Sequence, residues 1–590
     1  MEGVTTRGDL RGRVPLLAQA VVEPPPALPH EVPPPPPAPA GPPGTGPPAQ
    51  KPPRARSRLW EALPAVFFGI NVFALTLAFN ALRHSLAPDL QVDELIYTSA
   101  GQNFAAGNGL IVQGQAFFWQ PPLFFLIEAP VIAALHLQQV NTFAAAVQLR
   151  LVDDVIAALT ATVAFAMLWR MRGRWAGLTA GFLFAVDPYV LHLTRRVYLD
   201  PMAVLLIIGA IFLIYESMGH WTWRRRLAVG VVIGLAVLTK ELAAFALLVP
   251  VLLWLRREMS LKEPLTIGLT AVVVYGAYPV AAYITGNMGL FLGLKSLQYQ
   301  HLTGLIHFNS FTRPGAPITQ SFSATIGDYW PSYLCIAAAI PMTAFLWFRR
   351  DRAARVLAAW SVTSYGLVGM LGAFKSIEDQ FFLYLMLPVL CVIGYCTALA
   401  FTRLRSSMRA SWRDERSSMR IAYGLLSAVL TVAVLASLVP NDLRLWTQRY
   451  AIGFDNGYTK LLGAIAQTVP QGAVVDSPGG SSEELKFAWP DGPYTFVQVR
   501  QPSQLRQDQI HWFVLRSKDI GITTTSGIDK QYYDYIVSHA SLRVWGVSEH
   551  SYYDFGLWYV ADPSTLPDVN FPITPLPGGH QIQPNQFQPQ

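Results

Sequence analysis

The sequence is poor in charge. Charged residues make up 14% of the 590 positions and hydrophobic residues 52%, whereas a typical soluble domain is about 25% charged. This balance excludes an ordinary soluble protein. Apolar runs long enough to cross a bilayer as helices recur between residues 62 and 439. The composition therefore predicts an α-helical polytopic membrane protein.

Cysteine is also scarce. The three cysteines, Cys335, Cys391 and Cys396, all lie in apolar segments, so neither a disulfide framework nor a zinc pattern is predicted. Most Lys and Arg flank apolar runs. The net charge of +7 therefore indicates membrane topology, and no nucleic-acid partner is predicted.

Two ends of the chain have the composition of disordered segments. Residues 1–58 are rich in proline, and residues 563–590 are rich in proline and glutamine. Neither has enough apolar side chains to form a core. We expect the first to be a cytoplasmic tail.

Basic clusters between the apolar runs predict the topology. If all of them are cytoplasmic, each neighbouring pair must be separated by an even number of crossings. The run 121–137 breaks this parity and carries Pro121, Pro122, Glu128 and Pro130, so it is predicted to be a helix in the outer interface. The clusters are Lys51/Arg54/Arg56/Arg58, Arg170/Arg172/Arg174, Arg224/Arg225/Arg226, Arg256/Arg257/Lys262, Arg349/Arg350/Arg352/Arg355 and the arginines of 403–420.

Eleven crossings remain, which place the N-terminus in the cytoplasm and the C-terminus outside a plasma (inner) membrane. They are 62–82, 148–169, 175–193, 201–219, 227–240, 241–255, 264–285, 332–348, 354–373, 381–401 and 421–439. The membrane domain would span 59–439, with a first outer loop at 83–147. Strand-like runs at 473–477, 494–499, 512–516, 542–548 and 556–560 alternate with helix-like segments. They predict an extracytoplasmic α/β domain over 440–562.

Several charged residues are predicted at the outer ends of the crossings, against the positive-inside trend. Ionisable groups at membrane depth usually face a cavity or a partner, so a water-filled outer cavity of mixed charge is expected. The set comprises Asp93, Glu94, Arg150, Arg195, Arg196, Asp200, Lys240, Glu241, Lys375, Glu378 and Asp379.

Each of these residues also has a purely structural interpretation. Asp93, Asp200, Glu378 and Asp379 could cap helices, with Pro201 at the first helical position after Asp200. Arg150, Arg195 and Lys240 could extend toward lipid headgroups. A carboxylate near cations would instead suit transfer from a lipid-linked phosphate, with a base for the acceptor proton and cations for the leaving phosphate.

The order of several short motifs resembles the GT-C glycosyltransferases, particularly the protein O-mannosyltransferase and aminoarabinose transferase group. The motifs are VDELIYTSAGQNFAAGNGL, WQPPLFF, QLRLVDD, RRVYLDPM, VLTKEL and EDQFFLYLMLPV, within residues 60–405. The resemblance implies an inverting transfer of a sugar from a polyprenyl-phosphate donor to an extracytoplasmic acceptor, which could be a glycan, a lipid or a protein.

The resemblance also implies roles for individual residues. Asp93 would be the catalytic base and Glu94 would shape the site. Donor phosphate contacts would be Arg150, Arg195, Arg196 and Lys240, and substrate-orienting candidates are Asp200, Glu378, Gln120 and His301. Trp119 and Gln120 stand where aminoarabinose transferases have a Glu-Lys pair. This difference removes a cation and a metal ligand, so no metal and no cofactor are predicted.

Two other classes of function stay open from the sequence. A lipid-linked sugar flippase or transporter would also carry intramembrane charge, usually near the midplane of repeated halves, and no internal repeat is visible. A non-catalytic membrane scaffold would not need acids and bases gathered on one side.

Overall fold

The computed structural model describes residues 56–82, 92–305, 318–374, 376–411, 440, 444, 447, 457–477, 481–489, 492–497, 499, 502–516, 530–546, 555–567 and 569. Most of both predicted tails, the crossing predicted at 421–439 and Lys375 lie outside these residues.

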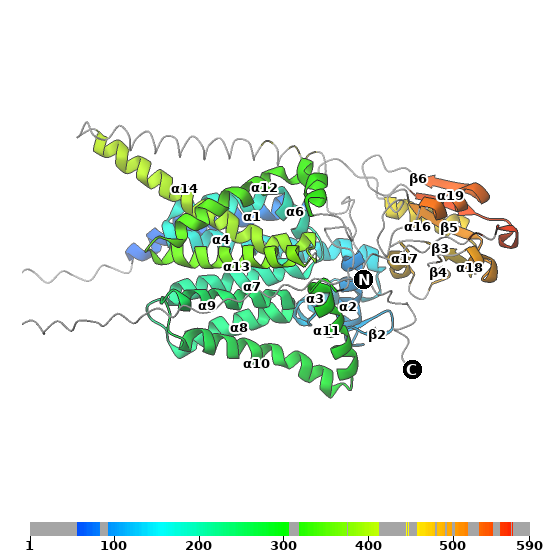
Figure 1. Ribbon diagram of the computed structural model, residues 1–590, viewed down its shortest axis with the longest axis horizontal. Coiled ribbons are helices and arrows are strands. Elements are labelled where there is room, and N and C mark those ends of the chain that lie inside the picture. The colour runs from blue at the N-terminus through cyan, green and yellow to red at the C-terminus, as the bar shows by residue number, and fades with distance from the viewer. Residues whose placement is uncertain are drawn as a thin grey trace, which may run out of the picture. The chain divides into compact units, whose positions relative to one another are not determined.

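Helices dominate residues 56–411 (Figure 1). They are α1 (Arg56–Ala81), α2 (Val92–Ala105), α3 (Leu123–Ala134), α4 (Thr142–Arg172), α5 (Arg174–Val186), α6 (Pro188–Thr194), α7 (Leu199–Ser217), α8 (Trp223–Thr239), α9 (Leu248–Leu255), α10 (Lys262–Ile284), α11 (Met288–Leu302), α12 (Ile318–Trp347), α13 (Arg352–Ala373) and α14 (Leu383–Ser411), with 3₁₀ helices η2 (Leu137–Gln139), η3 (Glu241–Leu247) and η4 (Asp379–Phe382).

Every predicted crossing that the structure describes overlaps a helix. Among the residues that the structure describes, seven spans are long and apolar enough to cross a bilayer, or eight if the bent pair α5–α6 counts as one span. The chain is therefore a multi-pass helical protein, as expected. The predicted segment 227–240 corresponds to α8, which has 17 residues. The predicted segment 241–255 corresponds to η3 followed by the short α9. The number of eleven crossings stays a prediction.

One predicted crossing, 175–193, is not a single straight helix. Helices α5 and α6 meet at an angle of 63°. Asp187 stands at the bend, where its carboxylate accepts the backbone N–H groups of Tyr189 and Val190. Pro188, which has no N–H, begins α6. The hydroxyl of Ser332 also donates to Asp187, at 2.9 and 3.0 Å, so the bend is held by a neighbouring helix.

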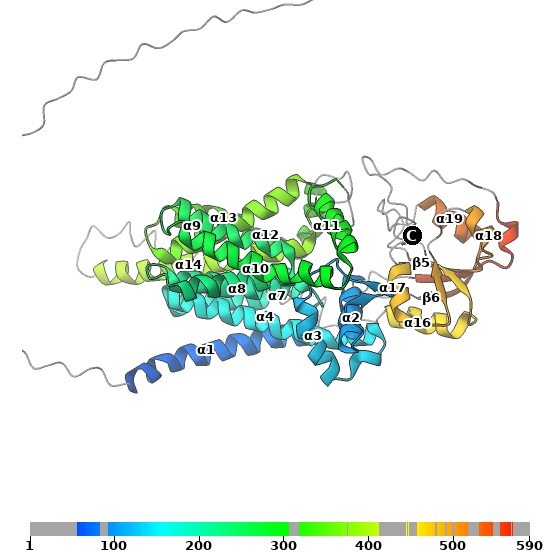
Figure 2. The ribbon, with the colours of Figure 1, turned by 90° about the horizontal axis from the view of Figure 1, so that it is seen from below.

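The predicted outer loop 83–147 contains ordered structure. Beside α2 and α3 it holds a small antiparallel hairpin of β1 (Ile111–Val112) and β2 (Gln115–Ala116). Figures 1 and 2 show α2, α3 and α11 together at one end of the helix bundle. At 12 residues α3 is too short to span a bilayer. Its Glu128 is completely buried, and this burial raises the pKa of the carboxyl to about 8.

Helices α8 and α10 pack closely because α8 presents two glycines, Gly230 and Gly234. A Cβ at Gly230 would lie 2.5 Å from Cβ of Thr270, and one at Gly234 would lie 2.6 Å from Cβ of Val274. Both distances are shorter than van der Waals contact. Small residues four apart commonly allow such close approach in membrane helices.

The C-terminal residues form a five-stranded sheet in the order β4-β3-β5-β7-β6. Strands β3 (Val474–Asp476), β4 (Thr495–Val497) and β5 (Trp512–Arg516) are parallel. Strand β7 (Phe555–Tyr559) is antiparallel to β5 and to β6 (Ser541–Gly546). Each of the five strands predicted from the sequence overlaps one of these. The accompanying helices are α16 (Gly457–Thr468), α17 (Ser481–Ala488), α18 (Pro502–Gln507) and α19 (Lys530–His539), with the 3₁₀ helix η8 (Pro563–Thr565).

Both faces of this sheet are apolar. Along β5, Phe513 and Leu515 pack into one cluster with Leu505 and Ile536, whereas Trp512 and Val514 pack into another that contains Leu461 and Leu485. Because successive strand residues point to opposite faces, this alternation is expected of a strand covered on both sides. Helices α18 and α19 pack against one face of the sheet, and α16 and α17 pack against the other.

Candidate functional site

The first feature of the site is the position of Asp93. It lies in the first turn of α2, not at its N-cap as the structural interpretation supposed. The residue is partly exposed, and it accepts no hydrogen bond from the residues that the structure describes. Burial, and then the negative charge of Glu378, raise the pKa of Asp93 to about 7, while Lys240 opposes this shift. The Asp93 carboxyl therefore shares an electrostatic environment with both of these residues.

Glu94 and Arg150 form a completely buried ion pair. The Arg150 guanidinium donates from Nε and Nη2 to the two carboxylate oxygens of Glu94, each at 2.8 Å. Glu94 also accepts the backbone N–H of Val197 at 3.1 Å. Arg150 is 1% exposed, so it does not extend to lipid headgroups. The pair joins α2, α4 and the segment that precedes α7.

A second buried ion pair joins α7 to the end of α8. Lys240 Nζ lies 2.6 Å from Asp200 Oδ2. Asp200 lies within the first turn of α7, whose N-cap is Tyr198, so the alternative interpretation of Asp200 as a helix cap is wrong. Lys240 follows α8 in an extended conformation, and its ammonium lies 5.3 Å from the ring centre of Phe381. This places the cation beside η4.

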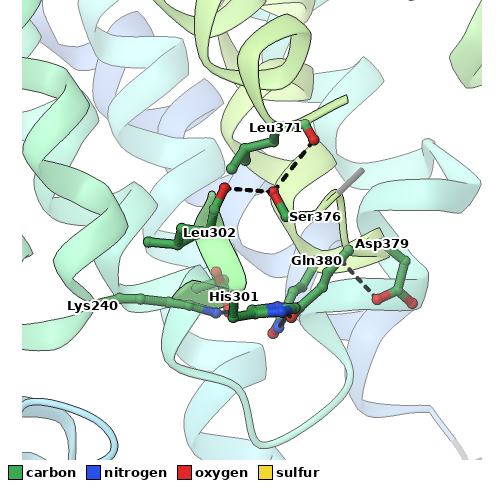
Figure 3. A network of polar contacts seen from close by, with 9 residues as sticks. Lys240, His301, Leu302, Leu371, Ser376, Asp379 and Gln380 are labelled. Carbon is green, nitrogen blue, oxygen red and sulfur yellow. Dashed lines mark hydrogen bonds and ion pairs between the residues drawn. The ribbon is translucent and has the colours of Figure 1, made fainter. Parts of the chain in front are cut away.

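The third component is a polar network around η4, drawn in Figure 3. His301 Nε2 on α11 lies 2.8 Å from Glu378 Oε1, and the Gln380 amide donates to the other oxygen of Glu378. Glu378 is at the N-cap position of η4 but makes no capping hydrogen bond with its side chain. Ser376 donates to the carbonyl oxygens of Leu302 and Leu371, at 2.9 and 3.3 Å, and so fixes the segment against the end of α11.

The two predicted arginines after α6 have different surroundings. Arg195 donates to the carbonyl oxygens of Phe79 and Leu82 at 3.2 and 2.8 Å. These are carbonyls at the C-terminal end of α1, which have no partner within the helix. Arg196 lies 6.0 Å from the ring centre of Tyr198. Both arginines are almost completely buried, so neither extends into headgroups.

The structure thus brings together side chains from five separate segments of the chain, namely Asp93, Asp200, Lys240, His301 and Glu378. The partly exposed carboxyl of Asp93 is close enough to Lys240 and to the carboxylates of Glu378 and Asp200 for their charges to change its pKa. In the part of the chain that the structure describes, no three His, Cys, Asp or Glu residues are arranged to hold a metal ion. The arrangement can accept a proton at Asp93 and can present positive charge at Lys240.

Comparisons with known proteins identify the fold. No curated protein sequence matches the chain, but residues 132–282 match the family model described as dolichyl-phosphate-mannose-protein mannosyltransferase. ArnT from Cupriavidus metallidurans bound to undecaprenyl phosphate is similar in structure, with a TM-score of 0.52 and 14% identity over 86% of this chain and 99% of that chain. The chain has the GT-C glycosyltransferase fold.

A second GT-C structure agrees. The archaeal oligosaccharyltransferase AglB from Archaeoglobus fulgidus, in complex with an inhibitory peptide and a dolichol-phosphate, has a TM-score of 0.52 and 11% identity over 78% of this chain and 70% of that chain. The segment 132–282 that matches the family model contains Arg150, Arg195, Arg196, Asp200 and Lys240. Asp93 and Glu94 precede it.

The backbone around Gln120 contacts two residues, Tyr278 and Lys295, that were not among the predicted site residues. The backbone oxygen of Gln120 accepts the hydroxyl of Tyr278 at 2.9 Å. Nearby, Lys295 Nζ on α11 lies 2.6 Å from Glu241 Oε1 and donates to the backbone oxygen of Trp119 at 3.2 Å. A lysine in the middle of α11, otherwise without charge before His301, was the signal that could have identified this contact.

Proposed function

We propose that the chain is an inverting glycosyltransferase that moves a sugar from a polyprenyl-phosphate donor to an extracytoplasmic acceptor. The observation that carries this proposal is the environment of Asp93. A general base works best when its pKa is close to the working pH, and the pKa of Asp93 is raised to about 7. Its carboxyl also accepts no hydrogen bond from the described residues, so it is ready to accept a proton.

The proposed reaction is a single displacement. Asp93 takes the proton from an acceptor hydroxyl, and the hydroxyl oxygen forms a bond to the anomeric carbon of the sugar. The bond between that carbon and the phosphate oxygen breaks on the opposite face, so the configuration inverts. The electron pair stays on the polyprenyl phosphate, whose developing charge is stabilised by nearby cations.

Lys240 is the cation best placed for this role, because its charge acts on the Asp93 carboxyl and its ammonium lies beside η4. Arg196 is a second candidate phosphate contact. The contacts of Arg150 with Glu94 and of Arg195 with α1 suit positioning: Arg150 would fix α2, and Arg195 would fix the segment before α7. Asp200, Glu378, His301 and Gln120 remain candidates for orienting the substrates.

The comparisons support the class of donor. ArnT was solved with undecaprenyl phosphate and AglB with dolichol-phosphate, and the matched family model is named for a dolichyl-phosphate sugar. These molecules share one chemistry, a long isoprenoid chain that bears a phosphate.

The proposal includes the topology inferred from charge. Eleven crossings in a plasma membrane would place the N-terminus in the cytoplasm, and would place α2 and the C-terminal α/β domain outside. Asp93 would then meet a donor presented on the outer face.

Release of polyprenyl phosphate from a panel of polyprenyl-phosphate sugars tests this function. The purified chain in nanodiscs should release it with at least one donor, and Asp93→Asn should lower the rate about 10²- to 10⁴-fold. Asp508→Asn, which removes an exposed aspartate from the C-terminal residues, is the matched control and should keep the wild-type rate. Wild-type turnover by folded Asp93→Asn protein would contradict the role of Asp93.

A further inference from the structure

A second polar site lies between the ends of α4 and α7 and the start of α13. A cavity of about 410 Å³ opens there. Its lining combines three basic side chains, two aromatic ones and one acid: Arg170, His220, Arg352, Trp169, Tyr215 and Glu216. Three of the basic clusters that the sequence places between crossings, at 170–174, 224–226 and 349–355, meet around this cavity.

The cavity has an excess of positive charge. Arg170 Nε lies 3.4 Å from Glu216 Oε1, and the two side chains are 65% and 39% exposed, so water weakens this pair. Arg352 is exposed and makes no hydrogen bond or ion pair with the described residues. One weakly held acid therefore faces two arginines and a histidine.

The backbone around the cavity is fixed. The Arg225 guanidinium donates to the carbonyl oxygens of Glu216 and His220, at 3.4 and 3.3 Å, which holds the turn after α7. Gly219 in that turn has a φ of +87°, and a Cβ there would lie 2.9 Å from Arg352 Nη2. The glycine thus leaves room for the arginine to lie against the turn.

This cavity is distinct from the candidate site. Arg150 and Arg170 are both on α4, and a rise of about 1.5 Å per residue separates them by about 30 Å along the helix. The same distance is the thickness of the hydrocarbon core of a bilayer. The cavity therefore lies at the membrane surface opposite the one that carries Asp93, where Trp169 and Tyr215 are suited to the headgroup region.

We propose that this cavity binds the phosphate of an anionic phospholipid headgroup. Basic pockets between helix ends at a membrane surface bind such headgroups, and guanidinium groups hold phosphate oxygens through paired N–H donors. Arg170 and Arg352 would contact the phosphate, and the aromatic rings would border the glycerol backbone. This proposal does not depend on the transfer reaction.

Lipid titration of the purified full chain in a neutral detergent tests the proposal. The probes are dioctanoyl phosphatidylglycerol, dioctanoyl phosphatidylcholine and inorganic phosphate, with binding followed by microscale thermophoresis. We expect saturable binding of phosphatidylglycerol, and about tenfold or greater weakening in the double variant Arg170→Gln/Arg352→Gln. Arg350→Gln/Arg405→Gln, which removes two exposed arginines from the same end of the bundle without touching the cavity, should bind as the wild type does.

Three outcomes would overturn the proposal. The first is equal binding by wild type and the cavity variant. The second is equal weakening in both double variants, which would indicate a diffuse surface charge effect. The third is binding of inorganic phosphate as tight as that of phosphatidylglycerol, which would assign the cavity to a soluble phosphate. A wild-type elution profile in size exclusion confirms that each variant is folded before titration.

Discussion

At the scale of single residues, the environment of Asp93 decides what the site can do. Burial and the charge of Glu378 raise its pKa to about 7, so the carboxyl is protonated below that pH and is a base above it. A pKa near the ordinary aspartate value of 3.8 would give a carboxylate that is ionised at neutral pH but is a much weaker base. The protein environment thus keeps the carboxyl basic enough to accept a proton near neutral pH.

A pH profile follows from this pKa. We expect kcat/KM to fall about tenfold for each pH unit below about 7, since only unprotonated Asp93 accepts the acceptor proton. The variant Glu378→Gln removes a negative charge that raises the pKa of Asp93, so the fall should begin at a lower pH. The measurement is the initial rate against pH with the lipid donor held well below its KM, where the rate is proportional to kcat/KM.

The direction of that shift separates two roles for Glu378. A purely structural role would lower the rate at every pH and leave the midpoint where it is in the wild type. A shift to higher pH would contradict the electrostatic account altogether.

At the scale of helices, contact between α8 and α10 positions Lys240, because Lys240 directly follows α8. The variants Gly230→Ala and Gly234→Ala would place a methyl group within 2.5 and 2.6 Å of side-chain carbons on α10. We expect each to destabilise the protein by about 1–3 kcal/mol, the usual cost of overpacking. Thermal unfolding in detergent measures this change.

Two glycines on α10 provide the matched control. A Cβ at Gly268 or Gly276 would meet nothing within 4 Å, so Gly268→Ala and Gly276→Ala should be neutral or slightly stabilising through helix propensity. If Gly234→Ala proves as well tolerated as these, close packing of α8 on α10 is not required.

Much of the element content could be predicted from the sequence. Hydropathy located the long helices because each run is apolar over a bilayer thickness, and alternation located strands such as β5. The bend at Asp187 was missed because hydropathy continues across it, although Asp-Pro is itself a signal for a helix start. The position of Asp93 in the first turn of α2 was also missed. Aspartate is common both at the N-cap and in the first turn of a helix, so its presence does not distinguish the two positions.

The pairings within the site could not be predicted. Glu94 lies 56 residues from Arg150, and His301 lies 77 residues from Glu378. Nothing in one sequence specifies which acid meets which base over such separations. Composition indicated that these charges must have partners, but only the packing of α2, α4, α11 and η4 supplies them.

At the scale of the whole molecule, the two ends of the bundle differ in chemistry. Asp93, Lys240 and Glu378 gather at one end, and the arginine-lined cavity lies at the other. This asymmetry agrees with the topology proposed from charge, in which basic residues remain in the cytoplasm.

Cysteine labelling tests that orientation. Gln113→Cys in the β1–β2 turn should react with a membrane-impermeant maleimide in intact cells, because the turn is proposed to be outside. Arg350→Cys, between α12 and α13, should react only after the membrane is permeabilised. The unchanged chain is the blank, since Cys335 and Cys391 are buried and Cys396 is partly buried. Labelling in the reverse pattern would invert the topology.

The long-range pairs also bear on how the protein is made. When Glu94 leaves the ribosome, its partner Arg150 has not yet been synthesised. The carbonyl groups at the end of α1 likewise have no side-chain donor until Arg195 is made. At about 10 residues per second, Asp93 would wait almost half a minute for Glu378. The nascent chain must therefore carry unpaired acids at the membrane surface during insertion, and the complete charge cluster forms only after most of the bundle has entered the bilayer.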